Sequence, residues 1–449
     1  MRHHFHRNMI VIVSAYSSGV KLAPLFRGRG YPCVHVTTAR EWDIKRLKSA
    51  FKEKDFIENF IVDSDEDLAA VLQRLRKFNI KAVLPGCESG VSLADVISQR
   101  FNVPRNDHAL TVARRNKFFM IEAIKKRGLL HPNQCKSNNL NDILQWAADV
   151  SVAKVVLKPL SSSSSDSVFY CSGADEITKA FKAIHGASDM YSEINGEVLA
   201  QEFIDGDEYI VNTVSRDGAH YVVDIWKGVS HDKSIVSNDS YADLVHPDAP
   251  EYQCLREYVA EVLSALGVEN GPAHSEIKLS PQGPCLIETG ARLAGKVDFA
   301  SVEEVFGYSQ ISLTAEAMLE PDVFKQRLAS ISMPKKHARY VYFATSHEGL
   351  IRHEPDMDEF TRIESVASVK YALKMGDQLR KTSKAYRSPR PGYAYLVAES
   401  ESKIEKDYLA LRKAETNLYS AIIRDTNPVN ERVVGGGKNR MAKTHNTKQ

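Results

Sequence analysis

The sequence predicts an α/β domain at the N-terminal end, followed by a longer α+β region, in a chain of 449 residues. Short apolar runs, which indicate buried parallel strands, alternate with helix-like stretches in the first domain. Beyond it, strand pairs joined by tight turns and longer helices replace that alternation. A chain of this length exceeds one ordinary core, so we expect two to four subdomains around a shared cleft.

The N-terminal α/β domain is expected over residues 9–104, after a disordered leader over residues 1–8. Alternating strands and helices of this length are typical of a small doubly wound sheet. The strands are predicted at Met9–Ala15, Tyr31–Thr37, Phe56–Val62 and Ile80–Pro85, and the helices at Asp65–Phe78 and Val91–Gln99.

The rest of the chain divides into three further units and a tail. A unit over residues 105–215 is mainly helical to residue 147, and a unit over residues 216–334 contains the amphipathic helix Tyr252–Leu266. Two strands around the turn at Asp205 and Gly206 look paired with each other. A unit over residues 335–430 ends in a charged helix, and residues 431–449 are expected to be a disordered basic tail. The remaining strands are predicted at Val152–Lys158, Val168–Cys171, Glu197–Phe203, Glu208–Ser215, Ala273–Leu279 and Cys285–Glu288.

The composition excludes several classes of protein. Lys and Arg number 59 against 57 Asp and Glu, a balance that favours neither a nucleic-acid partner nor a membrane surface. The six cysteines have no CxxC spacing, so we expect reduced thiols in a cytoplasmic protein. The apolar run near the N-terminus is too short to span a bilayer and lacks a signal-peptide cleavage pattern.

The most specific motif is HSEIKLSPQGPCLIETGARLAG, which starts at His274. Glu276 and Glu288 lie on two apolar strands joined by a tight turn, and a hairpin brings such positions side by side. Paired carboxylates suit Mg²⁺, which prefers hard oxygen ligands together with nucleotide phosphates. Arg292 adds a cation that can grip a transferring phosphoryl group. The alternative is an exposed hairpin with scattered charges.

A second motif, VVLKPLSSSSSDSVFY, places Lys158 at the end of an apolar strand before a serine run. Successive backbone N–H groups and serine hydroxyls can surround phosphate oxygens, and the lysine can reach an α- or β-phosphate. The alternative is a flexible serine linker. Strands on both sides of the run favour a hairpin flap.

Two weaker motifs flank this one. In LAQEFIDGDEYIV, backbone groups near Glu202, Phe203 and Ile204 can pair with an adenine edge, and Glu208 can accept from ribose hydroxyls. An ordinary hairpin with surface acids explains the same segment. In RRNKFFMIEAIKKRGLLHP, the basic residues open an amphipathic helix, and Lys117 is a second candidate phosphate contact. A solvated basic face is the alternative there.

Taken together and in this order, the four motifs resemble the ATP-grasp superfamily. Within it, the chain looks most similar to the bacterial L-amino-acid ligases, dipeptide synthetases of the bacilysin-synthetase type. LPGCESGVSLADVIS is similar to their N-terminal domain, and PGYAYLVAESE to their lid-like C-terminal subdomain. The resemblance implies a three-part ATP-grasp architecture and a ligase that joins two amino-acid-like substrates through an acyl-phosphate, releasing ADP and phosphate.

The resemblance also implies roles for individual residues. Arg292, Lys158 and Glu288 would be catalytic. Glu276 and Glu288 would hold the metal, which would be two Mg²⁺ ions, with Mn²⁺ as an alternative. Glu88 and Lys296 are the candidate substrate contacts, and the partners are small molecules, with a homodimer left open. The candidate ATP contacts are Lys117, Lys158, Ser161, Ser162, Ser163, Ser164, Ser165, Glu202, Phe203, Ile204 and Glu208.

One position departs from the family pattern. Many ATP-grasp enzymes have an asparagine two residues after the second glutamate, as a further metal ligand, and this chain has Gly290. The departure leaves open a nucleotide-binding module without turnover. The enzyme alternatives are another ATP-grasp carboxylase, although no biotin-attachment or carboxyltransferase segment is present in the sequence, and a D-amino-acid ligase. Lys296 follows Arg292 by four residues, so a helical stretch would point both cations the same way. Its partner would then be a substrate carboxylate, an acidic side chain, or Asp298.

Overall fold

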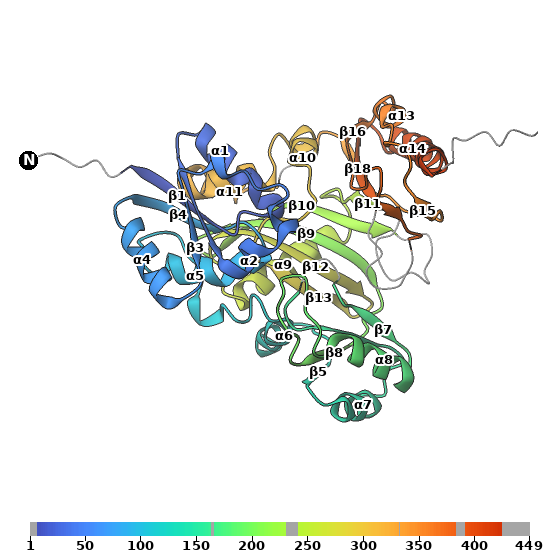
Figure 1. Cartoon of the computed structure of the whole chain (residues 1–449), viewed down its shortest axis with the longest axis horizontal. Coiled ribbons are helices and arrows are strands. Elements are labelled where there is room, and N and C mark those ends of the chain that lie inside the picture. The colour runs from blue at the N-terminus through green and yellow to red at the C-terminus, as the bar shows by residue number, and fades with distance from the viewer. Residues whose placement is uncertain (1–6, 163–165, 230–240, 332, 383–390, 424–449) are drawn as a thin grey trace, which may run out of the picture.

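The computed structural model describes residues 7–162, 166–229, 241–331, 333–382 and 391–423. Three sheets make up the body of the molecule, and a two-stranded ribbon of β15 (Gly349–Leu350) and β17 (Gln378–Leu379) lies near the C-terminal end. Figure 1 shows the N-terminal sheet in blue, a small sheet in green at the bottom, and the C-terminal part in orange and red. The predicted leader and tail fall almost wholly outside the described residues, apart from Arg7 and Asn8.

The N-terminal α/β domain is confirmed. Its four strands are parallel in the order β3-β2-β1-β4, and β1 is buried along five of its six residues. The serine at position 64 caps α4 by accepting from the N–H of Asp67, which fixes the start of that helix. The elements are β1 (Asn8–Val13), α1 (Leu22–Gly28), β2 (Cys33–Thr38), α2 (Ala39–Asp43), α3 (Lys45–Lys48), β3 (Glu58–Val62), α4 (Asp65–Leu75), β4 (Asn79–Pro85), the 3₁₀ turn η3 (Glu88–Gly90) and α5 (Val91–Ser98).

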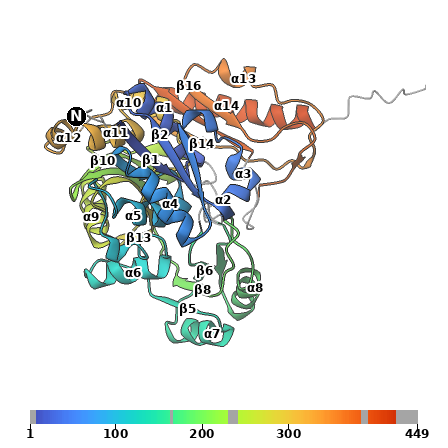
Figure 2. The ribbon, with the colours of Figure 1, turned by 60° about the vertical axis from the view of Figure 1, so that its left-hand side comes forward.

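The small sheet is antiparallel, in the order β5-β8-β6-β7. It projects away from the rest of the molecule, as Figure 2 shows. Strand β5 lies inside the stretch that the sequence predicted as mainly helical. The elements are α6 (Lys117–Lys126), β5 (Gln134–Ser137), α7 (Leu140–Asp149), β6 (Val155–Pro159), β7 (Phe169–Cys171), α8 (Ala174–Ile184) and β8 (Val198–Glu202).

The large sheet has eight strands in the order β13-β12-β9-β10-β11-β14-β18-β16. Its strands are β9 (Asp207–Arg216), β10 (Ala219–Val229), β11 (Tyr241–Leu244), β12 (Gly271–Ser280), β13 (Gly283–Gly290), β14 (His337–Tyr342), β16 (Val366–Tyr371) and β18 (Gly392–Ala398). The helices that belong to it are α9 (Tyr252–Ala265), α10 (Phe299–Phe306), α11 (Gln310–Leu319), α12 (Pro321–Arg327), α13 (Asp358–Thr361) and α14 (Glu401–Ile422).

This topology corrects three boundaries and pairings. The strands on either side of Asp205 and Gly206 do not pair, because β8 joins the small sheet and β9 joins the large one. A unit boundary at residue 215 would therefore cut off β9 from β10, its own partner. A boundary at residue 334 would divide the large sheet, since β14 pairs with β11.

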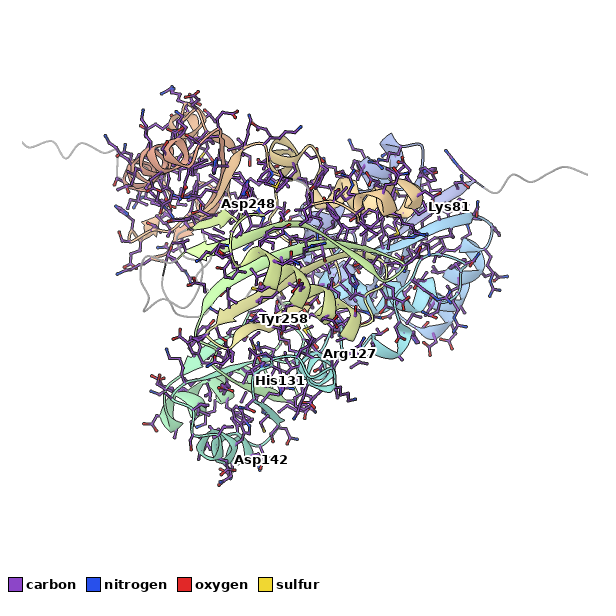
Figure 3. The ribbon with its side chains drawn as sticks, turned by 180° about the vertical axis from the view of Figure 1, so that it is seen from behind. Lys81, Arg127, His131, Asp142, Asp248 and Tyr258 are labelled. Atoms are coloured by element: carbon purple, nitrogen blue, oxygen red, sulfur yellow. The ribbon has the colours of Figure 1, made fainter. Side chains whose placement is uncertain are left out.

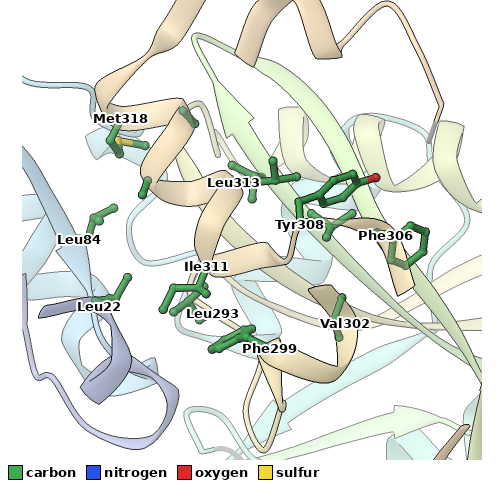
Figure 4. Close-up of a cluster of buried hydrophobic side chains, with 14 of the residues drawn as sticks. Leu22, Leu84, Leu293, Phe299, Val302, Phe306, Tyr308, Ile311, Leu313 and Met318 are labelled. Carbon is green, nitrogen blue, oxygen red and sulfur yellow. The ribbon is translucent and has the colours of Figure 1, made fainter. Parts of the chain in front are cut away.

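Two apolar layers cover the two faces of the large sheet. One layer joins α10 and α11 to the N-terminal domain, and Figure 4 shows Leu22 and Leu84 of that domain beside Ile311 and Met318 of α11. The other layer packs α6 and α9 against the opposite face. Burial of apolar surface stabilises the fold by about 25 cal/mol for each Å². The first layer therefore fixes the N-terminal domain on one face of the large sheet.

Tyr258 links the chain segment that leads into the small sheet to the large sheet. The hydroxyl of Tyr258 on α9 donates to the carbonyl of Leu130 at 2.8 Å and accepts from the N–H of Leu286 on β13 at 2.8 Å. Figure 3 places Tyr258 beside His131, at the joint between the two parts. Burial raises the pKa of Tyr258 far above its ordinary range, so the hydroxyl stays protonated and able to donate.

Candidate functional site

Lys117 is the first residue of α6 and points at the carboxylate of Glu288. Asn116 caps this helix by accepting from the N–H of Phe118 at 3.0 Å, which fixes where the helix starts. The Lys117 Nζ lies 2.9 Å from Glu288 Oε2 and 2.6 Å from the carbonyl of Ser162. The lysine and the positive end of the helix thus gather positive charge where a polyphosphate could bind.

Lys158 lies on β6 of the small sheet and is buried. Burial and the positive charge of Lys117 lower the pKa of Lys158 to about 8, while Glu288 and Glu276 act in the opposite direction. A buried lysine is costly unless an anion compensates it. The two lysines therefore provide a site for anions between the two sheets.

The two glutamates of the hairpin face each other as predicted. Glu276 on β12 and Glu288 on β13 are direct cross-strand partners, and the ladder shifts register immediately after Glu276. Burial favours the neutral acid, but the positive charges of Lys117 and Lys158 outweigh it and lower the pKa of Glu288 to about 2. Both side chains keep some exposure, 34% for Glu276 and 21% for Glu288, so both can take a ligand.

Next to Gly290, Glu88 is held between two arginines. Its carboxylate, buried in η3 of the N-terminal domain, accepts from Arg115 Nη1 at 2.9 Å and from Arg292 Nε at 3.0 Å. Arg292 follows β13 and also donates to the carbonyl of Leu293. Charge-assisted hydrogen bonds of this kind fix both the carboxylate and the guanidinium.

Gly290 makes room for this ion pair. A Cβ atom on Gly290 would lie 2.6 Å from Glu88 Oε2 and 3.0 Å from Arg292 Cζ, closer than carbon atoms approach such groups. The position that departs from the family pattern is therefore filled by Glu88 and Arg292. The missing asparagine is explained by packing against the N-terminal domain.

Two serines of the run, Ser161 and Ser162, have hydrogen-bond partners in the structure. Ser161 Oγ donates to the carbonyl of Arg115 at 3.3 Å, and Ser162 Oγ donates to Asp166 Oδ2 at 3.0 Å. Ser163, Ser164 and Ser165 lie outside the described residues.

At the predicted adenine edge, several groups already have partners. Glu202 ends β8, and its carboxylate accepts from the side chain of Asn133 at 2.9 Å. The N–H of Phe203 donates to the carbonyl of Lys154, so this amide has a partner within the protein. Glu208 lies 3.4 Å from Lys278 across the ladder. Ile204, the residue after Phe203, is partly buried.

Comparison with known proteins agrees with this geometry. Residues 151–299 match the ATP-grasp domain. Dapdiamide A synthase from Enterobacter agglomerans is 32% identical over 419 residues, which cover 92% of this chain and 97% of that protein. The chain belongs to the ATP-grasp family. It is an ATP-binding, ADP-forming C–N ligase, and the matched domain contains Lys158 and both hairpin glutamates.

Solved structures share the ATP-grasp fold. An L-amino acid ligase from Bacillus licheniformis superposes with a TM-score of 0.71 at 18% identity, covering 91% of this chain and 97% of that one. A carboxyaminoimidazole ribonucleotide synthase from Aspergillus clavatus, complexed with ATP, gives a TM-score of 0.64 at 13% identity, covering 92% and 99%. These likenesses confirm the three-part ATP-grasp architecture.

The donor set of the ATP-grasp hairpin fits a hard cation. Within the described residues, no three His, Cys, Asp or Glu side chains converge as a metal-binding group. Glu276 and Glu288 supply two carboxylates, which is the number that Mg²⁺ takes from a protein when phosphates and water complete its sphere.

The helical expectation for Lys296 is wrong. Residues 295 and 296 form a turn, and Lys296 has a φ of 56°, outside the helical region. Lys296 is exposed, and Asp298 lies 3.9 Å from Lys21 and caps α10 through Ser301. The role of Lys296 as a substrate contact stays a prediction.

Sequence reasoning missed four polar residues near this site. Arg115 was grouped with a solvated basic face, yet it holds Glu88. His274, Asn212 and Asp224 form a hydrogen-bonded row beside Glu276. An acid in the apolar run of β10, and a histidine two residues before a metal glutamate, were the available signals.

No helix in the described part of the chain has the length and apolar character needed to span a bilayer.

Proposed function

We propose that this ATP-grasp enzyme joins the carboxylate of one amino-acid-like substrate to the amine of another, through an acyl-phosphate. One observation carries the proposal. Two lysines act on the paired glutamates, and a Glu88–Arg292 ion pair lies against Gly290, two residues after Glu288. The likeness to dapdiamide A synthase and to an L-amino acid ligase supports amino acids as the substrate class.

The first step transfers the γ-phosphoryl group. A carboxylate oxygen of the first substrate bonds to the γ-phosphorus as the bond to the β–γ bridging oxygen breaks, and ADP leaves. Lys117 and Lys158 hold the phosphates, and Arg292 balances charge on the transferring group. Glu276 and Glu288 would hold Mg²⁺, two ions in the proposal, which supplies charge neutralisation on the phosphates when bound.

The second step forms the amide. The amine nitrogen bonds to the acyl carbon, the carbon–oxygen bond to phosphate breaks, and phosphate leaves with the amine proton passing to solvent. Glu88 keeps acceptor capacity beyond its two arginine contacts, because a carboxylate offers about four lone-pair positions. It can therefore bind a substrate ammonium while it fixes Arg292. The six free cysteines support a cytoplasmic setting.

A phosphate-release screen over pairs of amino acids, with mass spectrometry of the products, tests the proposal. Phosphate should appear only with ATP and two substrates, and the product mass should equal the sum of the two minus water. Release that needs bicarbonate in place of an amino acid would indicate an ATP-grasp carboxylase. Phosphate release without any condensed product would overturn the proposed ligase activity.

A further inference from the structure

A polar row crosses four adjacent strands of the large sheet. The strand register aligns Asp224 on β10 with Asn212 on β9, Asn212 with His274 on β12, and His274 with Gly290 on β13. Alternate residues of a strand share a face, so His274 lies on the face that carries Glu276. The row therefore leads from the interior of the sheet to the metal hairpin.

Hydrogen bonds run along this row without a break. Trp226 Nε1 donates to Asp224 Oδ1 at 2.7 Å, and Asn212 Nδ2 donates to the same oxygen at 2.6 Å. Asn212 Oδ1 contacts His274 Nδ1 at 2.8 Å. Asp224 and Asn212 are each only 4% exposed, so bulk water does not compete for these bonds.

The chemistry of the row sets the direction of every bond. Asp224 Oδ1 accepts from both Asn212 Nδ2 and Trp226 Nε1. Because the amide nitrogen of Asn212 faces Asp224, its amide oxygen faces His274. His274 Nδ1 must then carry a hydrogen, which leaves Nε2 as the ring nitrogen that can accept a hydrogen bond.

The lone pair of His274 faces the reaction site. Nε2 lies 3.8 Å from Glu276 Oε1, beyond hydrogen-bond distance, and has no hydrogen-bond partner within the described part of the chain. On the next strand, Gly290 places no side chain between His274 and the Glu88–Arg292 pair. His274 thus lies between the metal carboxylate and the pair that is proposed to grip the substrate.

We propose that His274 binds the incoming amine, with Nε2 accepting a hydrogen bond from an amine N–H, and that Asn212 and Asp224 position the ring. The inference rests on the proposed function and identifies a primary amine as the ligand of this position. The hydrogen bond turns the nitrogen lone pair toward the acyl carbon, and no proton transfer to the ring is required.

Two substitutions of His274 separate the ring nitrogens. A glutamine side chain places a polar group near the position of Nε2, and an asparagine near the position of Nδ1. At saturating ATP, His274→Asn should raise the KM for the amine substrate about tenfold, the effect of losing one polar contact. His274→Gln should keep it within about threefold, and the KM for ATP should stay within about twofold in both.

A coupling measurement adds a readout that a structural role alone would not change. When the amine is misoriented, water hydrolyses more of the acyl-phosphate before the amide forms. The His274→Asn variant should therefore form less amide for each ADP released than the wild-type enzyme. Asp224→Asn, which is remote from the reactants, should lower the same ratio to a smaller extent. The control is His220→Asn, since His220 Nδ1 makes a 2.8 Å bond to Ser215 between the same strands β9 and β10, away from the row.

The outcomes distinguish the inference from the proposed function. A wild-type enzyme that releases no phosphate with any amino-acid pair overturns the proposed function. A wild-type ligase whose His274→Asn variant keeps its amine KM and its amide-to-ADP ratio overturns only the role of His274. Equal rises in the KM values for ATP and amine, in a variant that unfolds at the wild-type temperature, also overturn it.

Discussion

The two ends of the active site hold their charges in different ways. At the proposed nucleotide end, Lys117 comes from α6, Lys158 from the small sheet and the two glutamates from the large sheet, so two positive groups meet two negative ones. At the substrate end, Arg115 and Arg292 hold the single carboxylate of Glu88, which leaves one positive charge in excess.

The difference indicates two kinds of recognition. The Lys117–Glu288 contact joins a helix to the large sheet through one ion pair, so we expect an arriving polyphosphate and its metal to replace that pairing. The substrate end is already fixed by two charge-assisted hydrogen bonds, and its excess positive charge suits a carboxylate or an acyl-phosphate. We therefore expect the first end to be rearranged by its ligand and the second to be preorganised for it.

The largest expected effect comes from removing a carboxylate at the nucleotide end. Glu288→Gln and Glu276→Gln should each reduce ATP turnover by on the order of a thousandfold, because a neutral amide holds Mg²⁺ poorly. The unfolding temperature should change little in Glu276→Gln, whose side chain is 34% exposed, and should fall in Glu288→Gln, which also removes the ion-pair partner of Lys117. Steady-state phosphate release and thermal unfolding measure the two quantities. Wild-type turnover that still needs Mg²⁺ in both variants would remove the hairpin from the metal site.

Gly290→Asn breaks the substrate end alone. The new side chain would collide with Glu88 and Arg292, and misplacement of a reacting group by about 1 Å costs about a hundredfold in rate. The ATP dissociation constant should remain within about threefold, which calorimetry measures. Gly295→Ala is the matched control, since a Cβ there meets no atom within 4 Å. A Gly290→Asn variant that is faster than the wild type would mean that the position is an empty metal ligand.

Lys158→Ala sharpens the comparison at the nucleotide end. Loss of one charge-assisted contact costs about 1.5–3 kcal/mol, so ATP should bind about tenfold or more weakly. Thermal stability without ligand should change less, because the removed ammonium is buried and destabilised by Lys117. Lys136→Ala is a control in the same sheet, since Lys136 pairs with Glu197. An unchanged dissociation constant by calorimetry contradicts the assignment.

Asp224→Asn tests the stability of the polar row that runs from Asp224 through Asn212 to His274. The pKa of Asp224 is raised from 3.8 to about 6, so the folded state binds more protons between these pH values and loses stability as the pH rises through them. The difference bounds this loss at roughly 3 kcal/mol, and we expect Asp224→Asn to gain about 1 kcal/mol near pH 7.5. The gain should vanish near pH 4, where Asp224 is protonated. Urea unfolding at both pH values measures this change in the free energy of unfolding. A variant that is less stable than the wild type at both pH values would show that the buried charge of Asp224 does not destabilise the fold.

The nucleotide end could be predicted from the sequence because its signals are local. Glu276 and Glu288 lie on strands joined by one short turn, and a tight turn fixes which residues face each other. Lys158 ends an apolar strand next to the serine run, and Lys117 begins a helix whose cap is visible in the sequence. Where neighbours in space are near neighbours along the chain, residue periodicity alone predicts the contact.

The substrate end could not be predicted in this way. Glu88, Arg115 and Arg292 are separated by 27 and 204 residues, counted from Glu88, and meet only because an apolar layer fixes the N-terminal domain on the large sheet. The turn at Gly206 looked like a hairpin, yet the chain crosses there between two sheets. Strand propensity determined that β8, β9, β10 and β12 would form and which residues alternate. Which strands became neighbours, and so whether Asp224, Asn212 and His274 would make one row, depended on packing that no local pattern encodes.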